Sequence, residues 1–590
     1  MAEPTLFDEA SLALIASGGA GKDGKVYSIK PTDGTGDFTF SRGSNLAATR
    51  VGADGLIEKG RENLLLQSNT FSNASWLKEL GASVTGNQSG YDGSSDAWQL
   101  DTDGTRFSRL RQIVSGSGVK TFSLYAKAGT LDWIGLYNGG GSASAFFDLT
   151  NGVTGNLSSS NIDASITSVG GGWYRCEYSF NESITDFRIY PTGTNGTFTT
   201  TAGNIYIQDA QLEIGLAATE VISTGATKGK AGLLEDEPRF DYSGGATCPS
   251  LLLEGSRTNL LEYSEYKASG NFTNSTPSYN ATSSPEGLQN ATEMFDNSTN
   301  GQHRVPIGSF SVTSGTDYTI SAFVKNNDIG YCYLLLEGGF TQTRYYFNLS
   351  TGQPITSGLE VENFANGWYR IYVTQSAAST GTGTAYLNMS NNGVSPIYAG
   401  SNQSLYFYGL QAEQGSYATS YIPNHSGGTI TRGADDMNVL NLQSNNLFGV
   451  DSGFIFYEFT SIDDLFIGWT SAQTKDRFQY LDIDGSANGY FRFRGYESNI
   501  SLQVVNLGAS PSSLIIPDGS QKICISWNAS SFSVFADGSK IGTMTTASSI
   551  AVNAISNFNG NLGNKEALMK KMLWGNTAMS DADCITLTTI

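Results

Sequence analysis

Short runs in which apolar and polar residues alternate recur along most of the chain. Residues 121–127 and 318–325 alternate over most of their length, as do 173–178 and 368–373. Clusters of Gly, Asn, Ser and Thr separate such runs every ten to fifteen residues. A period of two is typical of β-strands that bury one face, and the polar clusters are typical of turns. The pattern therefore predicts an all-β fold of antiparallel jelly-roll β-sandwiches.

Many of these runs occur twice, in the same order and roughly 200 residues apart. The matched pairs are 61–69 and 257–265, 122–127 and 320–325, 147–152 and 347–352, 172–175 and 367–370, and 211–215 and 411–415. A period this long indicates a duplicated domain and not a solenoid. We therefore expect two sibling jelly rolls, module 1 at 58–225 and module 2 at 253–428.

The rest of the chain divides into shorter segments and one further domain. We expect an extended N-terminal arm at 1–57, a connector strand at 226–252, a linker at 429–436 and a third β-sandwich at 437–590. Within the arm, residues 8–15 could form one short helix. In the third domain, Asp537-Gly538 lies between two alternating runs, and an Asp-Gly pair in this position is a strong signal for a β-hairpin.

Three stretches carry more specific motifs. The first is 25–43, continued by 48–51 and 55–58; the second is 248–260 and the third is 411–423. Together they resemble a family of head-spike and tail-fibre proteins of tailed bacteriophages, and the third is similar to the last strand of carbohydrate-binding jelly rolls. The runs 535–541 and 573–583 resemble laminin-G or concanavalin-like lectin sandwiches.

The resemblance implies a structural protein on the virion surface that adheres to host-surface glycans. It also implies attachment to phage capsid or tail proteins through the N-terminal arm, and self-association as a homotrimer. The sequence contains no sustained heptads, so a trimer would assemble without a coiled-coil stalk. Two alternatives stay open, a polysaccharide depolymerase and a bacterial surface adhesin.

Composition and charge exclude several classes of function. The formal net charge is −20, and an acidic chain repels phosphate backbones and anionic lipids, so we expect no nucleic-acid partner. No run of about 18 apolar residues exists, so we expect no membrane insertion, and no secretory signal is evident. The five cysteines are widely spaced, which favours buried thiols over a disulfide framework.

Few residues carry catalytic or metal-binding chemistry. The two histidines, His303 and His425, stand alone in polar stretches, where we expect surface loops and neither a catalytic triad nor a zinc site. Asp482 and Asp484 are two residues apart on an expected strand and share a face, which makes them weak candidates for calcium. A depolymerase would need two carboxylates that lie close together across a cleft, and the sequence alone does not show which carboxylates lie close together. We therefore predict that the chain is not an enzyme.

Aromatic residues carry the binding hypothesis, because sugar rings stack their apolar faces on aromatic rings. Trp133 and Tyr137 share a strand face in module 1, and Tyr331 and Tyr333 share one in module 2. Of the adjacent tyrosines at 345 and 346 only one can face a ligand, and we choose Tyr345. The repeated residues Trp173 and Trp368 are assigned to the sandwich cores.

Overall fold

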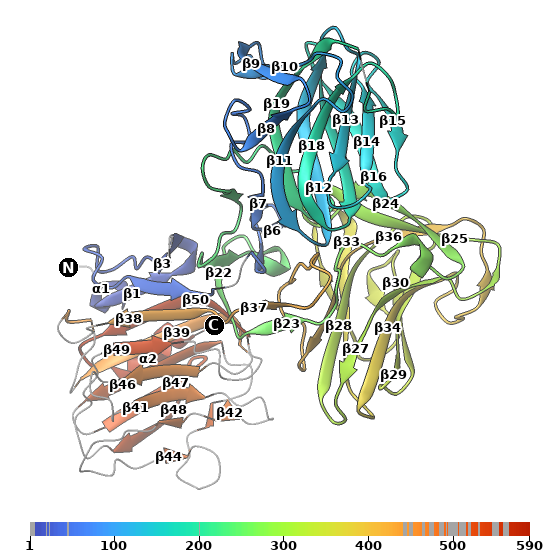
Figure 1. Cartoon of the computed structure of the whole chain (residues 1–590). Helices are drawn as coiled ribbons and strands as arrows, with labels where there is room; N and C mark the ends of the chain where they lie inside the picture. The colour runs from blue at the N-terminus through green and yellow to red at the C-terminus, as the bar shows by residue number, and fades with distance from the viewer. Residues whose placement is uncertain are drawn as a thin grey trace.

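In the computed structural model, the described part of the chain forms three β-sandwiches, with module 1 above module 2 and the C-terminal sandwich (Figure 1). The described residues are 6–18, 21–22, 24–43, 46–199, 201–440, 445–447, 452–462, 466–470, 477–482, 489–490, 492–493, 505–506, 515–516, 521–528, 531–545, 554–557 and 566–589. Within them, no helix is long and apolar enough to cross a bilayer. The all-β expectation is confirmed.

Module 1 consists of two antiparallel sheets packed face to face. One has the strand order β16 (Asn161–Gly170), β17 (Trp173–Asn181), β12 (Val119–Ala128), β19 (Gly203–Ile214), β10 (Ala97–Thr102), β9 (Ala82–Gln88). The other has the order β15 (Val153–Leu157), β14 (Ser144–Asp148), β13 (Trp133–Asn138), β18 (Ile184–Thr192), β11 (Arg109–Gly116), β8 (Trp76–Glu79). Alternate residues such as Phe122, Leu136 and Ile189 fill the core between them.

Module 2 repeats this arrangement. Its first sheet has the order β24 (Ser275–Ser283), β25 (Gln289–Asp296), β36 (Ser404–Gln414), β28 (Asp317–Asn326), β33 (Trp368–Ser376), β32 (Leu359–Asn363). Its second has the order β27 (Arg304–Val312), β34 (Gly381–Ser390), β29 (Tyr331–Gly338), β30 (Thr343–Asn348), β31 (Gln353–Pro354), and β26 (Asn300–Gly301) pairs with β35 (Tyr398–Ala399). Lys127 pairs with Trp173 in module 1 as Lys325 pairs with Trp368 in module 2. The duplication seen in the sequence is therefore a duplication of fold.

The repeated motifs tie the ends of each module together. Asn63 is fully buried; it donates to the carbonyl oxygens of Ala210 and Ile222 and accepts from the amides of Leu65 and Leu212. Its counterpart in module 2, Asn259, donates to the carbonyl oxygen of Ile422 and accepts from the amides of Leu261 and Ala412 in the same way, and its other donor bond goes to the Ser264 hydroxyl. Because an unpaired buried amide is costly, an asparagine at this position holds the first and last strands in register.

The C-terminal sandwich is built from segments that are far apart in the sequence. One sheet has the strand order β21 (Arg239–Asp241), β22 (Ser250–Glu254), β50 (Glu566–Gly575), β39 (Gly453–Ile462), β46 (Lys522–Asn528), β47 (Ser531–Ala536), β48 (Ser539–Thr545). The strand β1 (Leu12–Ile15) also pairs with β50 in this sheet. The other has the order β2 (Gly21–Lys22), β3 (Lys25–Val26), β4 (Phe38–Ser41), β38 (Asp436–Leu440), β49 (Ala554–Asn557), β40 (Phe466–Thr470), β41 (Arg477–Asp482). The helix α2 (Asp581–Thr588) packs against β46 and β47.

Residues 12–41 therefore do not form the extended arm that the sequence predicts. Leu12 and Leu14 on β1, and Phe38 and Phe40 on β4, are buried in the core of the C-terminal sandwich. Alternating apolar residues need a partner sheet, and here the end of the chain supplies it. The helix expected at 8–15 is also wrong, because α1 (Leu6–Glu9) ends before β1 begins.

Short paired strands join the three sandwiches, and the remaining elements are brief. The joining pairs are β5 (Thr49–Val51) with β6 (Ile57–Lys59), β7 (Arg61–Asn63) with β20 (Gly229–Ala231), and β23 (Arg257–Asn259) with β37 (Ile430–Arg432). The others are η1 (Ala16–Gly18), η2 (Ser243–Gly245), η3 (Ser269–Asn271), η4 (Ala365–Gly367), β42 (Gly489–Tyr490) with β45 (Ile515–Ile516), and β43 (Arg492–Phe493) with β44 (Val505–Asn506).

A first buried ionic cluster, the Asp435 cluster, fixes the C-terminal sandwich to module 2. Its members are Arg42, Arg239, Arg432, Glu254 and Asp435. Asp435 pairs with Arg42 at 3.2 Å and with Arg239, while Arg432 lies 2.7 Å from Glu254. Every carboxylate in this cluster faces at least one guanidinium, which is what makes buried charges tolerable.

A second cluster, the Glu265 cluster, lies beneath the hairpin β5–β6 on module 2. Its members are Lys59, Arg61, Glu265, Glu286, Tyr408, Tyr421 and His425. Lys59 lies 2.6 Å from Glu265, which also accepts from the hydroxyls of Tyr408 and Tyr421. The carbonyl oxygen of His425 accepts from the amide of Val119 at 3.0 Å, so module 1 is joined to the same place.

Both histidines are buried, contrary to the surface loops expected for them. The ring nitrogens of His303 lie 2.6 Å and 3.1 Å from the carbonyl oxygens of Asn274 and Tyr398. The Nε2 of His425 lies 3.3 Å from Glu265. Cys176, Cys332, Cys524 and Cys584 are buried free thiols as expected, whereas Cys248 is exposed.

Candidate functional site

The outer face of β13 presents the two aromatic residues predicted for module 1. Ile134 and Leu136 point into the core, so Trp133, Gly135 and Tyr137 lie on the opposite, outer face. Trp133 and Tyr137 are partly exposed. The shared face of these two rings follows from the strand period alone.

Other aromatic rings, which the sequence analysis missed, surround Tyr137. The ring of Phe198 lies 5.6 Å from Tyr137, 4.8 Å from Phe146 and 4.4 Å from Tyr190. A side chain at Gly135 would meet Phe146 and Phe198, so the glycine makes room for these rings. We call Trp133, Tyr137, Phe146, Tyr190 and Phe198 the aromatic face of module 1. Strand register brings Phe146 and Tyr190 beside Gly135, and register is not visible in one sequence.

A row of charged residues borders this aromatic face. The guanidinium of Arg188 lies 5.3 Å from the centre of the Tyr137 ring and pairs with Asp186. Burial raises the pKa of the Asp186 carboxyl, but the Arg188 and Arg111 guanidiniums together outweigh it and lower that pKa. Arg111 also pairs with Glu79 at 2.9 Å. The row stays charged and supplies donors and acceptors next to the exposed rings.

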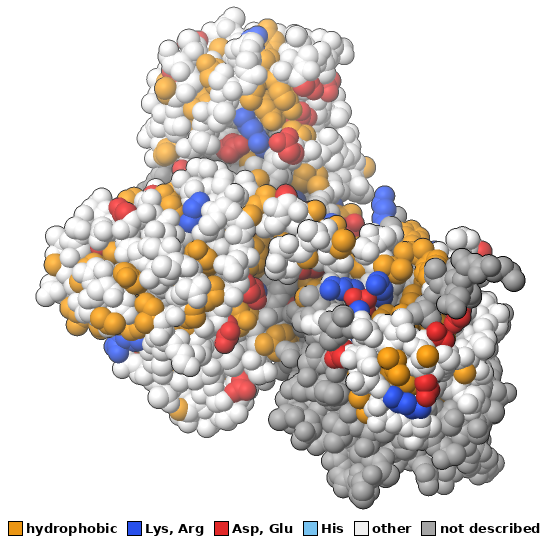
Figure 2. Space-filling view, turned by 180° about the vertical axis from the view of Figure 1, so that it is seen from behind, with side chains coloured by type: hydrophobic (Ala, Val, Ile, Leu, Met, Phe, Trp, Pro, Cys, Tyr) orange, Lys and Arg blue, Asp and Glu red, His pale blue; other side chains and the backbone are white. Residues whose placement is uncertain are grey.

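Figure 2 shows the surface of the molecule from behind. Much of the visible surface in Figure 2 is neither charged nor hydrophobic, and on the upper lobe, module 1, hydrophobic side chains gather beside a few charged ones. Surfaces of this composition offer many hydroxyl and amide groups.

In module 2 the structure removes two of the three predicted residues from the candidates. Tyr333 lies on the outer face of β29 but is fully buried, with its ring 4.7 Å from that of Tyr346. Tyr345 points inward and belongs to the core, because β30 turns Tyr346 outward instead. Only Tyr331 stays partly exposed. A ring without exposed area cannot stack on a sugar.

The two modules fill the same space in different ways. Gly135 lies opposite Phe146 and Tyr190 in module 1, and Tyr333 lies opposite Tyr346 and Asn388 in module 2. In module 2 the strand itself supplies the ring at this position, whereas in module 1 the 193–199 loop supplies Phe198. The aromatic face is thus more open in module 1.

Trp173 and Trp368 are buried, but they do not lie in the cores between the sheets, where we expected them. Trp173 packs with Tyr125 and Tyr91 on the outer side of β12 and β17, where the rings of Tyr91 and Tyr125 stack at 3.6 Å. Trp368 occupies the equivalent place in module 2, covered there by Ile57 from the hairpin β5–β6. The repeated tryptophan thus packs against the residues that cover the outer face of the sheet in both modules.

An acidic side chain borders the Tyr91 cluster. The pKa of the Asp209 carboxyl is raised to about 6: burial is the main cause and nearby Asp96 and Asp92 add to it, while the Tyr91 hydroxyl, which donates to Asp209 at 3.1 Å, opposes the rise. Within the described residues, no group of three His, Cys, Asp or Glu side chains is placed to hold a metal ion. The calcium candidates are not tested: Asp482 ends β41 without a described side chain, and Asp484 lies outside the described residues.

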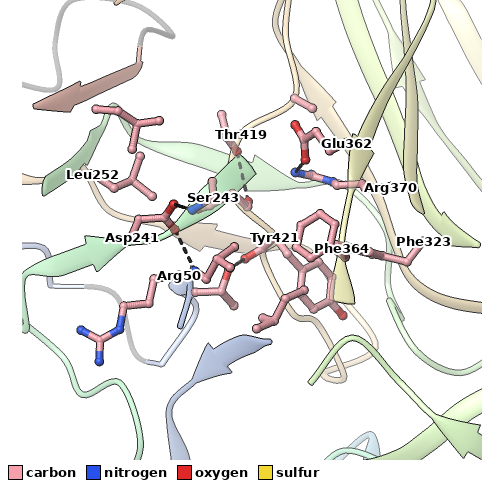
Figure 3. A pocket seen from close by; sticks show the side chains of 16 residues that line it. Arg50, Asp241, Ser243, Leu252, Phe323, Glu362, Phe364, Arg370, Thr419 and Tyr421 are labelled. Atoms are coloured by element: carbon pink, nitrogen blue, oxygen red, sulfur yellow. Dashed lines mark hydrogen bonds and ion pairs between the residues drawn. The ribbon is translucent and has the colours of Figure 1, made fainter. Parts of the chain in front are cut away.

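A pocket of about 190 Å³ opens between module 2, the hairpin β5–β6 and the C-terminal sandwich (Figure 3). Phe323, Phe364 and Tyr421 gather on one side of it, and Glu362 and Arg370 point toward one another above them. A wider cavity of about 630 Å³ adjoins it and shares four lining residues, Val51, Ser243, Glu362 and Phe364.

Comparisons with known proteins show no family. No family model and no curated protein matches the chain. The tandem CBM22-1-CBM22-2 domain of Xyn10C from Paenibacillus barcinonensis is similar at 11% identity and a TM-score of 0.20, covering 64% of this chain and 99% of that one. The mavirus major capsid protein is similar at 9% identity and a TM-score of 0.13, covering 62% and 88%. Scores this low carry no conclusion about function.

Proposed function

We propose that this chain is an adhesive structural protein of a tailed-bacteriophage virion that binds host-surface glycans through the aromatic face of module 1. One observation carries the glycan part: the partly exposed rings of Tyr137 and Phe198 lie beside the Arg188–Asp186 pair, and Trp133 lies on the same strand face. Exposed rings can stack on the apolar face of a sugar, and the charged pair can bond its hydroxyls. The virion part depends on the motif resemblance alone.

The architecture suits such a role. Module 1 lies at one end of the molecule, away from the C-terminal sandwich (Figure 1), and buried ionic clusters hold the parts in fixed positions. Because residues 12–41 belong to the C-terminal sandwich, we propose that attachment to capsid or tail proteins uses that sandwich and not a free arm. Self-association as a trimer would multiply weak glycan contacts into avidity.

Replacing Trp133 or Tyr137 by alanine should weaken glycan binding about tenfold each, since an aromatic stack contributes about 1–1.5 kcal/mol. Binding is measured on arrays of bacterial lipopolysaccharide, teichoic acid and capsular polysaccharide. Val394→Ala, which truncates a more exposed apolar residue on module 2, is the control and should bind as the unaltered chain does. Equal binding by all three variants would refute the role of this face.

We also propose that the chain binds polysaccharide without cleaving it. Incubation with the same polysaccharides should release no reducing ends over hours. Release of reducing ends that Asp482→Asn abolishes would favour a depolymerase instead. Mass spectrometry of purified phage particles tests the virion role, because a bacterial surface adhesin would be absent from them.

A further inference from the structure

We propose that the pocket between module 2, the hairpin β5–β6 and the C-terminal sandwich is a second binding site, for a neutral oligosaccharide. The site is separate from the aromatic face of module 1 and does not depend on it. Three observations lead to this proposal: the size of the connected cavities, the opposition of an apolar and a polar wall, and the donating and accepting groups that the polar wall leaves for a ligand.

The size of the cavities suits a short chain of sugar rings. The inner pocket has a volume of about 190 Å³, about six times the volume that one water molecule occupies in the liquid. The wider cavity of about 630 Å³ lies within the range of roughly 300–1,000 Å³ that is usual for small-molecule sites. Because the two share lining residues, a ligand can enter through the wider part and place one ring in the inner part.

The apolar wall is a cluster of three aromatic rings. The ring of Phe323 lies 5.0 Å from Phe364 and 5.8 Å from Tyr421. Phe323 and Tyr421 are buried, while Phe364 keeps part of its ring exposed toward the cavity. Figure 3 shows these rings on one side of the pocket. The partly exposed ring of Phe364, packed edge-on against Phe323, is the surface on which the C–H face of a sugar can stack.

The polar wall is the pair Glu362 and Arg370. The Arg370 Nη1 lies 3.6 Å from Glu362, whose side chain is 40% exposed. Arg370 itself is 3% exposed; its Nη2 donates to Ser321, and its Nε has no hydrogen-bond partner among the described residues. Because Arg370 lines the pocket, a ligand hydroxyl there can accept from its guanidinium.

Other polar groups at the pocket are already engaged. Asp241 accepts from the amides of Val51 and Ser243 at 2.7 Å and 2.8 Å. The guanidinium of Arg50 points away from the rings in Figure 3 and pairs with Glu58 at 2.6 Å. The Glu362–Arg370 pair is therefore left to offer a ligand one accepting and one donating group, and Asp241, whose partners are amides and not a cation, makes the pocket unfavourable for an anion such as phosphate. Hydroxyls, which both donate and accept, match this pair.

The test uses the full chain and four trisaccharides: maltotriose, cellotriose, xylotriose and triacetylchitotriose. Isothermal titration and thermal unfolding should show binding of at least one of these trisaccharides. The Tm should rise because the ligand would bind the folded protein and contact residues of module 2, the hairpin β5–β6 and the C-terminal sandwich. Phe364→Ala and Glu362→Gln should each weaken that binding at least tenfold. Val394→Ala, at an exposed side chain that does not line the pocket, should leave it unchanged.

Two results would overturn the proposal. The first is no heat and no Tm shift with any trisaccharide, which would mean that the pocket holds only water. The second is binding that Trp133→Ala abolishes but Glu362→Gln does not, which would place the sugar on the aromatic face alone and leave the proposed function intact. Glu362→Gln keeps the shape of the side chain, so it tests the site even where Phe364→Ala lowers stability.

Discussion

Replacing Asp435 by alanine should destabilise the junction of module 2 and the C-terminal sandwich by about 3–5 kcal/mol, because it leaves buried positive charges without a partner. Asp435 is 1% exposed; it pairs with Arg42 and Arg239 and accepts from the amide of Glu254 at 2.9 Å. Burial lowers the pKa of the Arg42 guanidinium, and the negative charge of Asp435 raises that pKa part of the way back. Without that carboxylate, both guanidiniums must find water by opening the junction.

Urea unfolding followed by tryptophan fluorescence measures this loss, and limited proteolysis within 429–436 reports the opening. Asp581→Ala is the matched control, because Asp581 pairs with Lys540 at 2.6 Å but keeps 58% of its side chain exposed. An exposed pair contributes only about 0.2–1 kcal/mol. A loss for Asp435→Ala no larger than that of the control would show that the Asp435 cluster does not hold the junction.

Acid should weaken the same junction, with most of the loss between about pH 4.5 and 2. Burial raises the pKa of Glu254, but the guanidiniums of Arg432 and Arg239 together outweigh it and bring the pKa from 4.5 to about 2. A pKa lowered by folding stabilises the fold above the unfolded value and loses that contribution as the pH falls through the folded value. For Glu254 the loss amounts to about 3 kcal/mol.

Glu265 adds to this acid sensitivity with the same sign. Burial raises the pKa of its carboxyl, but His425, Lys59 and Arg61 together bring it well below the ordinary value. Urea midpoints at pH 7, 4 and 3 measure the effect. Glu254→Gln should be less stable at pH 7 and should lose less between pH 4.5 and 2. An identical pH profile for the variant and the unaltered chain would exclude Glu254 as the titrating group.

The sequence was sufficient to predict the β-sandwiches and the duplication of modules 1 and 2. Alternation along 121–127 and 318–325 identified strands that the structure places in equivalent positions, β12 and β28. A period-two pattern records which residues face the core, and that depends on the strand alone. The repeated Asn63 and Asn259 appear in the sequence as a motif, although their bonding becomes visible only in the fold.

The candidate site could be predicted only in part. Trp133 and Tyr137 share an exposed face, as the spacing requires, but nothing in the sequence shows that Tyr346 covers Tyr333 or that Tyr345 points inward. Those outcomes depend on register between neighbouring strands. The pocket at Glu362 and Arg370 was missed because its walls come from residues hundreds of positions apart, such as Val51 and Leu568.

The pairing of β1 with β50 has a consequence for how the protein is made. Leu12 meets Trp574 across these strands, so the segment that carries Leu12 must wait until the segment that carries Trp574 has been synthesised. At about 5–20 residues per second, that interval is roughly half a minute to two minutes. During it the apolar strands near the N-terminus have no native partner, and chaperones or a neighbouring polysome product could capture them.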